Sequence, residues 1–415
     1  MGGGVRPAGA PARALVRWTV FWVGTLNQTV LPELRHPVGL YDTTLRDGEQ
    51  AVGVVLDADQ KVELARLLDE AGVDRIEAGF PRVSEEDWEA AARIGRLGLR
   101  AEVWGFARAL VGDVEAVLRA GLRCTVVEAP VSEVKLRAFG LSGEEVLRRI
   151  EQAVGYGARE GMKVAFFAVD GSRADLEFLR RAYGVALEAG AEELVVVDTL
   201  GVLSPAAAGY LVRQVGEWFG PQVPLHYHGH NDFGLATATA LAAVEAGARW
   251  VHGTVDGMGE RAGNADLFQV GLALAGLYGR PTGLRLERVQ ELSWRLREVA
   301  GYQVEPWKPL VGENLFRRET GAVAMQFHVP EAIEPYAAEV VGAKRRLVLG
   351  KKSGLASIRI KCEELGLQVP EEAQGDLLAR VKELSIRKRG LVSDEEFRAL
   401  VAARRPEPAG KEGGP

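Results

Sequence analysis

The histidine-rich segment 225–232 is the strongest sign of chemistry in this sequence. It holds three of the chain's six histidines. Because alternate side chains of a strand point to the same side, His228 and His230 at a strand end would aim two imidazoles at one point. Two imidazoles and a carboxylate from another strand make a metal site with open coordination positions. His226 would lie further inside the fold, where it packs or supports the ligands.

The segment 41–50 can supply the carboxylate that such a metal site needs. It is typical of an apolar strand that runs into a polar loop. Asp47 in this loop can bind the metal, and the adjacent Arg46 can place a fixed positive charge against negative charge that develops during a reaction. Arg-Asp-Gly alone is a common turn, so the prediction of a divalent-metal site depends on both segments together.

A repeated pattern indicates the elements that would position these residues. Five times before residue 260, a helical run ends in Ala-Gly or Glu-Gly and an apolar strand with a polar end follows. Gly directly after a helix is the expected cap, because it adopts a left-handed conformation without steric cost. With three further strands the pattern predicts eight. The predicted strands are 38–42, 75–77, 101–106, 124–128, 164–170, 194–198, 225–229 and 250–256.

Eight strands that alternate with helices over about 240 residues match the size of a (β/α)8 TIM barrel. A doubly wound sheet is the structural alternative. It has fewer strands, and no G-x-G-x-x-G follows the first predicted strand here. We therefore predict an α/β fold, a TIM barrel followed by a smaller, mainly helical C-terminal region.

In such a barrel the active site lies at the carboxyl ends of the strands. Those ends carry polar residues here, which would form a ring at one mouth. Ordinary loop polarity is the alternative explanation, and it does not account for the histidine-rich segment. The residues of this ring are Asp42, Arg46, Asp47, Glu77, Arg108, Asp170, Asp198, Thr199, His228, His230 and Asp256.

The rest of the chain divides around this barrel. We expect a catalytic barrel over 38–285 and C-terminal linker subdomains over 286–402. The first 37 residues, 1–37, are interpreted as an N-terminal extension that is disordered or only loosely docked. The last residues, 403–415, are rich in Pro, Gly and charge, which predicts a disordered tail.

Composition excludes several classes of protein. With 47% hydrophobic residues, 26% charged residues and a net charge of −6, the chain lacks the excess of Lys and Arg that nucleic-acid binding requires. The apolar run 18–23 is too short to span a membrane. Cys124 and Cys362 lie far apart and match no disulfide or zinc pattern. We expect two buried, reduced thiols in a cytoplasmic protein.

Four segments together resemble the signatures of a known family. They are 42–50, 76–81, 228–234 and 257–264. In combination they look like those of the DRE-TIM metallolyase superfamily, and within it the 2-isopropylmalate and homocitrate synthases. The resemblance covers about residues 38–400.

The resemblance implies a set of metal ligands. Asp47, His228 and His230 would hold a divalent cation, with Asn264 as a candidate further ligand. Mg, Mn and Zn all tolerate these ligands, so the sequence leaves the metal open. Arg46 would stabilise an enolate or oxyanion during catalysis.

The resemblance also implies residues around the substrates. Glu77 would take part in catalysis from the substrate shell, and Gln50 would lie in the same shell. Thr199 would hydrogen-bond the carboxylate of a 2-oxo acid. Arg108 matches an arginine that is common on the family's third strand, and we assign it to substrate binding.

The activity implied by the resemblance is a Claisen condensation of acetyl-CoA with a 2-oxo acid. The metal polarises the keto group, and a base removes a methyl proton from acetyl-CoA. The enolate attacks the keto carbon, and water hydrolyses the thioester. The products would be a 2-substituted malate and CoA. Small-molecule substrates, an acyl-CoA and a 2-oxo acid, are thus the expected partners. The resemblance also implies a homodimer, which is the usual oligomeric state in the family.

The fifth predicted strand departs from the family pattern. Positions that carry an arginine and a glutamate in the family fall on Ala165 and Val169, with Phe167 between them on the same face. An apolar face leaves a second carboxylate desolvated without compensation. This favours an acceptor with an apolar side chain, such as 2-oxoisovalerate or pyruvate, as in a 2-isopropylmalate synthase. A slip in this alignment would leave a homocitrate synthase that uses 2-oxoglutarate as the alternative.

A second departure follows the barrel. Arg318 and Val323 stand where the family carries the histidines of a His-x-Ser-Gly-Ile-His phrase, often credited with proton transfer, and His328 lies too far along to replace them. We keep Arg318 as a candidate catalytic residue that adds positive charge near the CoA or the enolate. Further on, Lys351 and Lys352 are candidates for contact with CoA phosphates, or else a solvated basic turn.

Three other functions deserve comparison with this one. A lyase of the hydroxymethylglutaryl-CoA lyase type would use the same metal, but such lyases generally lack the long region after the barrel. Non-haem iron oxygenases also use two histidines and a carboxylate, yet they usually have β-barrel folds. A non-catalytic binding protein would have no need of Arg46 beside the metal carboxylate.

Overall fold

The computed structural model of this protein describes residues 20–34 and 36–403. Most of the predicted N-terminal extension and of the predicted tail therefore lies outside the described residues. Within the extension, helix α1 (Leu26–Val30) is present.

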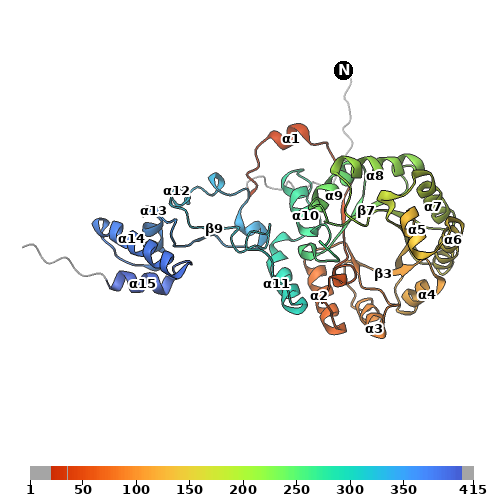
Figure 1. The fold of residues 1–415 in the computed structure, drawn as a ribbon, viewed down its shortest axis with the longest axis horizontal. Helices are drawn as coiled ribbons and strands as arrows, with labels where there is room; N and C mark the ends of the chain where they lie inside the picture. Colours follow the sequence, from red (N-terminus) through yellow and green to blue (C-terminus); the bar gives the residue numbers. More distant parts are fainter. Residues whose placement is uncertain (1–19, 35, 404–415) are drawn as a thin grey trace, which may run out of the picture. The chain divides into compact units, whose positions relative to one another are not determined.

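Eight parallel strands close into a barrel, in the order in which they occur along the chain (Figure 1). The last strand pairs with the first, with Asp42 opposite Gly253, and this pairing closes the sheet. The predicted TIM barrel is confirmed, and each predicted strand is found. The strands are β1 (Gly39–Asp42), β2 (Arg75–Glu77), β3 (Glu102–Arg108), β4 (Cys124–Pro130), β5 (Lys163–Val169), β6 (Glu193–Asp198), β7 (Leu225–Gly229) and β8 (Trp250–Gly253).

Helices surround the barrel, and local sequence signals set their ends. Helix α2 begins with a capping box in which Asp57 accepts a hydrogen bond from the backbone N–H of Gln60. All five glycines predicted to follow helices have positive φ, from +72° at Gly161 to +115° at Gly247. The helices are α2 (Ala58–Glu70), α3 (Glu85–Ile94), α4 (Val111–Arg119), α5 (Glu133–Phe139), α6 (Gly143–Arg159), α7 (Leu176–Glu188), α8 (Pro205–Phe219), α9 (Ala236–Glu245), α10 (Leu267–Gly276) and α11 (Val289–Ala300).

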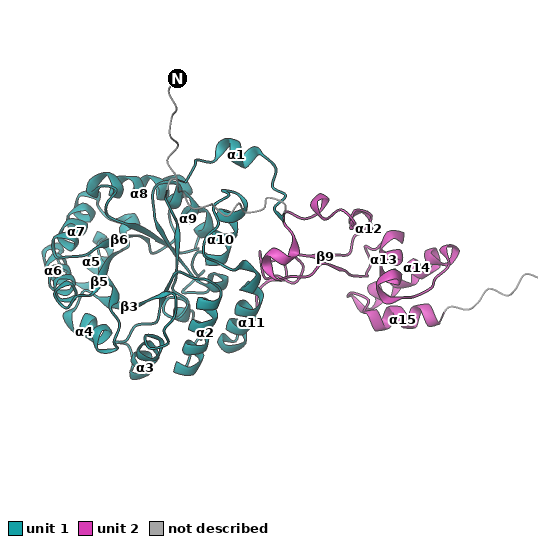
Figure 2. Cartoon of the chain, turned by 180° about the vertical axis from the view of Figure 1, so that it is seen from behind, with its two compact units in different colours: residues 1–302 teal, residues 303–415 magenta. Residues whose placement is uncertain are grey.

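The chain forms two compact units, residues 1–302 and 303–415 (Figure 2). The second unit packs its helices around a separate apolar core that includes Ile358, Val381 and Phe397. The domain boundaries predicted from the sequence, with a division at 285/286, stay a prediction. The elements of the second unit are β9 (Arg317–Arg318), α12 (Gly321–Ala324), β10 (Arg346–Leu347), α13 (Leu355–Leu365), α14 (Glu371–Lys388) and α15 (Asp394–Ala402).

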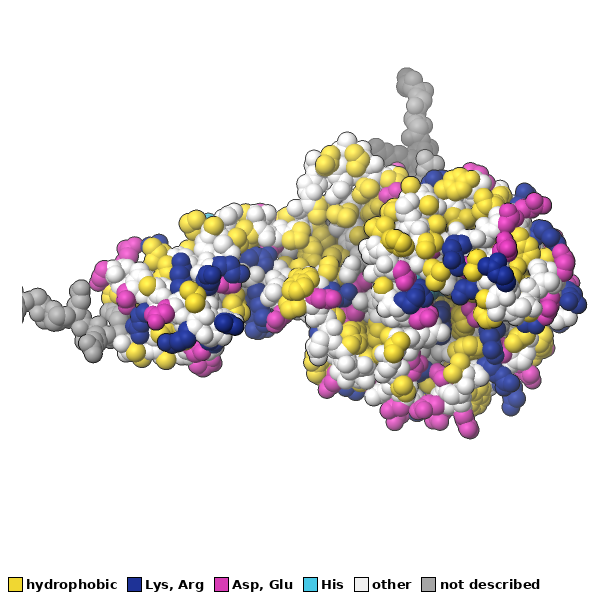
Figure 3. Space-filling model, viewed as in Figure 1, with side chains coloured by type: hydrophobic (Ala, Val, Ile, Leu, Met, Phe, Trp, Pro, Cys, Tyr) yellow, Lys and Arg dark blue, Asp and Glu magenta, His cyan; other side chains and the backbone are white. Residues whose placement is uncertain are grey.

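The charged surface and the two buried cysteines are as expected from the composition of the chain. Acidic and basic side chains lie among apolar ones on the face shown in Figure 3. Cys124 and Cys362 are both free and buried, as expected. Among the described helices, none has the length and apolar character needed to cross a membrane.

Inside the barrel, an ionic cluster lies where the strands begin. Arg75 donates two hydrogen bonds to Glu193, at 2.6 and 3.0 Å. The imidazole Nε2 of His226 lies 2.8 Å from the same carboxylate, and its Nδ1 lies 2.9 Å from Nε2 of His252. Burial alone would raise the pKa of Glu193, but His226 and Arg75 outweigh it and hold the pKa well below its usual range. His226 is thus a packing residue of the barrel interior, as the sequence indicated.

Replacement of Glu193 by alanine should destabilise the barrel by about 3–5 kcal/mol, because it leaves buried cationic groups without their main partner. The adjacent Glu192 is exposed, and Glu192→Ala is the matched control. Urea unfolding followed by circular dichroism measures both variants. Equal midpoints for the two would show that the cluster contributes little.

Candidate metal and substrate site

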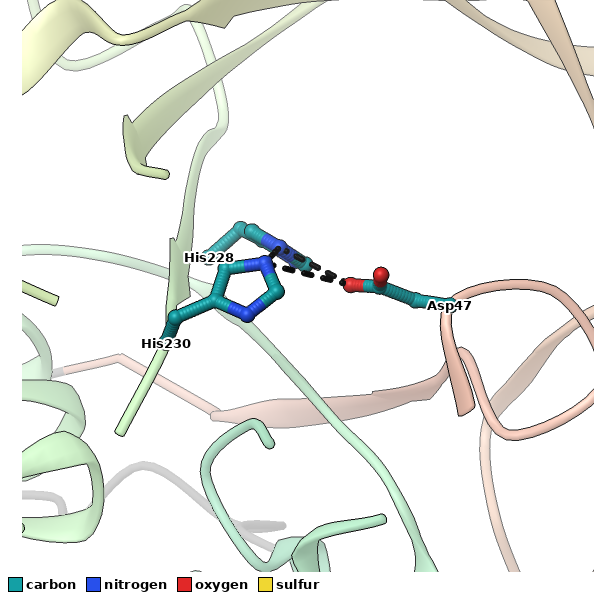
Figure 4. Close-up of side chains that lie close together, drawn as sticks. All are labelled: Asp47, His228 and His230. Carbon is teal, nitrogen blue, oxygen red and sulfur yellow. Dashed lines mark hydrogen bonds and ion pairs between the residues drawn. The ribbon is translucent and has the colours of Figure 1, made fainter. Parts of the chain in front are cut away.

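Asp47, His228 and His230 point toward one another at the mouth of the barrel (Figure 4). The Oδ2 atom of Asp47 lies 3.2 Å from Nε2 of His228 and 3.6 Å from Nε2 of His230. The two Nε2 atoms are 3.4 Å apart. One ligand atom from each residue lies within 4.8 Å of the other two, and all three side chains are buried. The structure therefore brings together the three residues predicted to hold a metal.

Strand alternation and a tight loop produce this convergence. His228 lies in β7, and His230 follows the strand, held by a hydrogen bond from its backbone N–H to the carbonyl of Asp198. The backbone N–H of Asp47 donates to the carbonyl of Thr43, and the N–H of Thr43 donates to Gly253. The loop after β1 is thereby tied to β8, and β8 pairs with β7.

The electrostatic state of Asp47 and His230 suits a divalent cation. Burial would raise the pKa of Asp47, but Arg46 and the two imidazoles outweigh it and keep the pKa far below its usual range. Burial lowers the pKa of His230 to about 4. An ionised carboxylate and a neutral imidazole are the forms that bind metals. Within the described chain, Asp47 Oδ2 accepts no hydrogen bond, which leaves it free to act as a ligand.

Arg46 is held beside this carboxylate by Glu77. Its Nε donates to Oε2 of Glu77 at 2.9 Å, and its Nη1 lies 3.4 Å from Oδ1 of Asp47. The guanidinium stacks on the ring of Phe106, with its carbon 4.2 Å from the ring centre. Its buried Nη2 has no hydrogen-bond partner in the described part of the chain. One donor of a fixed cation therefore remains free for a substrate.

A cavity of about 420 Å³ opens at this mouth. Most residues predicted from the sequence to form the site line it. Glu77, Ala165, Asn264 and Arg318 are not among the residues that line it. The predicted residues that line it are Arg46, Asp47, Gln50, Arg108, Phe167, Val169, Thr199, His228 and His230.

The residues predicted to bind substrate differ in whether their hydrogen-bond donors are already used within the chain. The hydroxyl oxygen of Thr199 accepts a hydrogen bond from the backbone N–H of Asp170, at 2.8 Å, so its own O–H can still donate. Arg108 is half exposed and donates to Asp113 at 2.6 and 3.2 Å. Gln50 is exposed at the rim. Thr199 is thus the better placed of these to bind a carboxylate.

The predicted barrel residues that do not line the cavity are buried. Glu77 has no exposed surface, so its visible role is to hold Arg46. Ala165 belongs to the apolar cluster inside the barrel, together with Phe167. Asn264 pairs with His230 in an isolated bridge, and its Oδ1 lacks a partner among the described residues. Asn264 thus stays a candidate ligand.

Arg318 lies in the second unit, where its guanidinium is bound by backbone carbonyls. Its Nη1 donates to the carbonyls of Leu315 and Arg317, and its Nη2 to that of Ile333. It also lies 3.7 Å from the buried Glu334. Its catalytic role remains a prediction.

Four ionisable residues of the cavity were not predicted as site residues, and one of them, Glu260, lies within the segment 257–264 that carries the family resemblance. Glu128 ends the alternating face of β4, and a charged residue at an inward position of a strand is a signal that could have identified it. Lys135 and Arg149 come from α5 and α6. Lys135 carries no such signal, because α5 is an additional helix between β4 and α6 that the repeat pattern does not contain. Arg149 lies on a helix, where strand alternation does not apply.

A family model described as HMGL-like matches residues 37–294, which is more than half of the chain. The chain belongs to the HMGL-like family. A second model, a homocitrate synthase post-HMGL domain, matches residues 310–389. These matches confirm the predicted membership of the DRE-TIM superfamily and the kinship with its synthases.

Relatives of this HMGL-like chain carry three different synthase names. A homocitrate synthase AksA of Methanopyrus kandleri is 44% identical over 89% of this chain and 93% of its own length. From the same organism, a probable 2-isopropylmalate synthase is 45% identical over 84% of this chain and 70% of its own. A putative (R)-citramalate synthase CimA is 43% identical over 88% and 72%.

Solved structures of other HMGL-like proteins share the barrel. The HMG-CoA lyase of Bacillus subtilis superposes with a TM-score of 0.59 at 20% identity, covering 66% of this chain and 97% of that one. The hydroxymethylglutaryl-CoA lyase of Pseudomonas aeruginosa gives 0.59 at 24% identity, covering 65% and 95%. At these identities the likeness shows the fold alone.

Asp47→Asn should weaken the binding of Mn²⁺ at least tenfold, because the amide removes the anionic ligand from the cluster. Asp59 is exposed on α2, and Asp59→Asn serves as the control. Isothermal titration calorimetry of metal-free protein measures the affinity. Unchanged Mn²⁺ affinity in Asp47→Asn would place the metal elsewhere.

Proposed function

We propose that this protein condenses acetyl-CoA with a 2-oxo acid to give a 2-substituted malate and CoA. The observation that supports it most is the buried cluster of Asp47, His228 and His230 with an unpaired guanidinium nitrogen of Arg46 beside it. The names of the relatives agree with a condensing synthase. The enzyme is accordingly an acyltransferase, whose acyl group becomes an alkyl group on transfer.

A divalent cation, Mg, Mn or Zn, would be held by Asp47, His228 and His230, with Asn264 as a further candidate. When bound, it supplies Lewis-acid polarisation of the acceptor's keto group. The donor set fits such a cation, since Asp47 is ionised and Asp47 Oδ2 and Asn264 Oδ1 lack hydrogen bonds from described residues. Three protein ligands leave coordination positions open for a substrate.

The chain's own residues stabilise charge and orient the substrates. The free Nη2 of Arg46 donates to the oxygen on which negative charge develops, and the hydrogen bond to Glu77 fixes its direction. Thr199 donates its hydroxyl to the carboxylate of the 2-oxo acid, and Gln50 lies in the same shell. Arg318 is kept as a source of positive charge near the CoA or the enolate.

The acceptor carries a side chain without a second carboxylate, such as 2-oxoisovalerate or pyruvate. Phe167 and Val169 line the cavity on the β5 side, above the fully buried Ala165. This wall presents no cation to a second carboxylate, whose desolvation would cost several kcal/mol. The proposal is therefore a synthase of the 2-isopropylmalate or citramalate type.

A homocitrate synthase that uses 2-oxoglutarate is the second candidate. The relative with that name matches nearly the full length of both chains. Lys135 lines the cavity, and its ammonium has no hydrogen-bond or ion-pair partner in the described residues. A free ammonium could pair with a second carboxylate. A lyase is less favoured, because the second unit matches a post-HMGL domain of synthases.

Two broader proposals accompany the function. A homodimer follows from the habit of the family. A cytoplasmic location agrees with two free, buried thiols, which suit a reducing compartment.

Thiol release from acetyl-CoA should occur with 2-oxoisovalerate or pyruvate and fall to background with 2-oxoglutarate. It should also stop after addition of a chelator and return with Mn²⁺ or Mg²⁺. Reaction of the free thiol with a chromogenic disulfide measures the rate. Turnover with 2-oxoglutarate alone would establish the homocitrate candidate, and thiol release with no 2-oxo acid would contradict the condensation.

Arg46→Gln should lower kcat by roughly 10²- to 10³-fold with a smaller change in KM, because the lost donor acts on charge that appears only during the reaction. Arg66 is exposed on the outer face of α2, and Arg66→Gln is the matched control. Steady-state kinetics of thiol release separate the two constants. A change confined to KM would assign Arg46 to ground-state binding.

A further inference from the structure

Glu128 occupies the inward face of β4 at the mouth of the barrel. Cys124 and Val126, four and two residues earlier on the same face, belong to the apolar cluster inside the barrel. Glu128 pairs in register with Arg108 of β3 and with Phe167 of β5. All three of these residues line the cavity, so Glu128 places a carboxyl group in its wall between Arg108 and Phe167.

The carboxyl group of Glu128 has no hydrogen bond or ion pair with any residue that the structure describes. The nearby cations have other partners, since Arg46 binds Glu77 and Arg108 binds Asp113. Burial raises the pKa of Glu128 to about 7, although Arg46 and Arg108 act in the opposite direction. Glu128 is partly exposed in the cavity, so a bound ligand that supplies a donor can pair with its carboxyl group.

The acceptor can reach Glu128 from the metal end of the cavity. In a closed barrel of eight strands β3 lies opposite β7, so Glu128 on the neighbouring β4 lies across the mouth from His228 and His230. Phe167 of β5 lies between these two sides, with its ring centroid 5.0 Å from that of His228. The same cavity touches both sides. A 2-oxo acid with its keto and carboxylate groups at Asp47 and the histidines therefore extends its side chain toward Glu128 and Phe167.

We propose that Glu128 determines acceptor selectivity, favouring a 2-oxo acid whose side chain ends in a hydroxyl group over one that ends in a carboxylate. This inference rests on the proposed function. A hydroxyl can donate a charge-assisted hydrogen bond to Glu128. A methyl group of the same size leaves the carboxylate unpaired, and a second carboxylate meets a like charge.

Lys135 provides the competing possibility within the same cavity. If its free ammonium determined selectivity, a second carboxylate would be favoured instead. The two residues predict opposite orders for acceptors of equal chain length. The comparison of 2-oxopentanoate, 5-hydroxy-2-oxopentanoate and 2-oxoglutarate therefore distinguishes them.

The experiment compares wild type, Glu128→Gln and Glu128→Leu with these three acceptors. Assays at about pH 8 keep the carboxyl group mainly ionised. Glu133 is exposed at the start of α5 and lies outside the cavity, so Glu133→Gln is the matched control. Thiol release gives kcat and KM, calorimetry gives the Kd of each acid, and thermal unfolding confirms that each variant folds.

Wild type should use the hydroxy acid best and 2-oxoglutarate least. Glu128→Gln should keep the preference for the hydroxyl and improve kcat/KM for 2-oxoglutarate at least about tenfold, mainly through KM. Glu128→Leu should prefer the methyl end over the hydroxyl, again by about tenfold or more. The control should keep the wild-type order.

Several outcomes would overturn the inference. An equal loss for all three acids in both variants would make Glu128 a structural residue. A wild-type preference for 2-oxoglutarate that survives Glu128→Gln would assign selectivity to Lys135. Absence of thiol release with every acid would contradict the proposed function. In that case the order of the Kd values of the three acids in wild type and variants still tests the role of Glu128. Unchanged Kd ratios, or no binding of any acid, would contradict the inference.

Discussion

The burial of Asp47 is the constraint on which the site depends. A carboxylate without access to water must be paired, because an isolated buried charge is strongly unfavourable. Here a guanidinium and two imidazoles surround it, and together they hold its pKa far below the usual range. The positive charge of Arg46 is balanced in turn by Glu77. A cation added to this cluster would meet an ionised ligand and a neutral imidazole of His230 without any rearrangement of charge.

Much of this arrangement could be predicted from the sequence because it follows from local rules. The spacing of His228 and His230 puts both rings on one side of a strand, and glycines after helices mark the repeat that produces eight strands. The ends of parallel strands in a barrel share one mouth, which brings Asp47 to them. Its role as a ligand is a proposal, but its place in the cluster followed from the fold class.

The remaining features depend on contacts that a linear pattern does not specify. Lys135 enters the cavity from α5, a helix outside the repeat. Glu77 was expected near the substrate, yet it lies behind Arg46, since the direction of a side chain at a strand end depends on its ion pair. The orientation of Arg318 is set by carbonyls of its own unit, which no motif indicates.

The three synthase names among the relatives suggest that different parts of one barrel bind the shared and the variable ends of the acceptor. Acceptors of such enzymes share a keto acid end and differ in the side chain. In the proposed reaction the residues at β1 and β7 act on the shared end, so they would not distinguish the acceptors. Discrimination would then come from the cavity wall of β3, β4 and β5, which contributes Phe106, Arg108, Glu128, Phe167 and Val169. A single uncompensated carboxyl in that wall changes the free energy of a hydroxyl, a methyl and a carboxylate by different amounts, which is the requirement for selectivity.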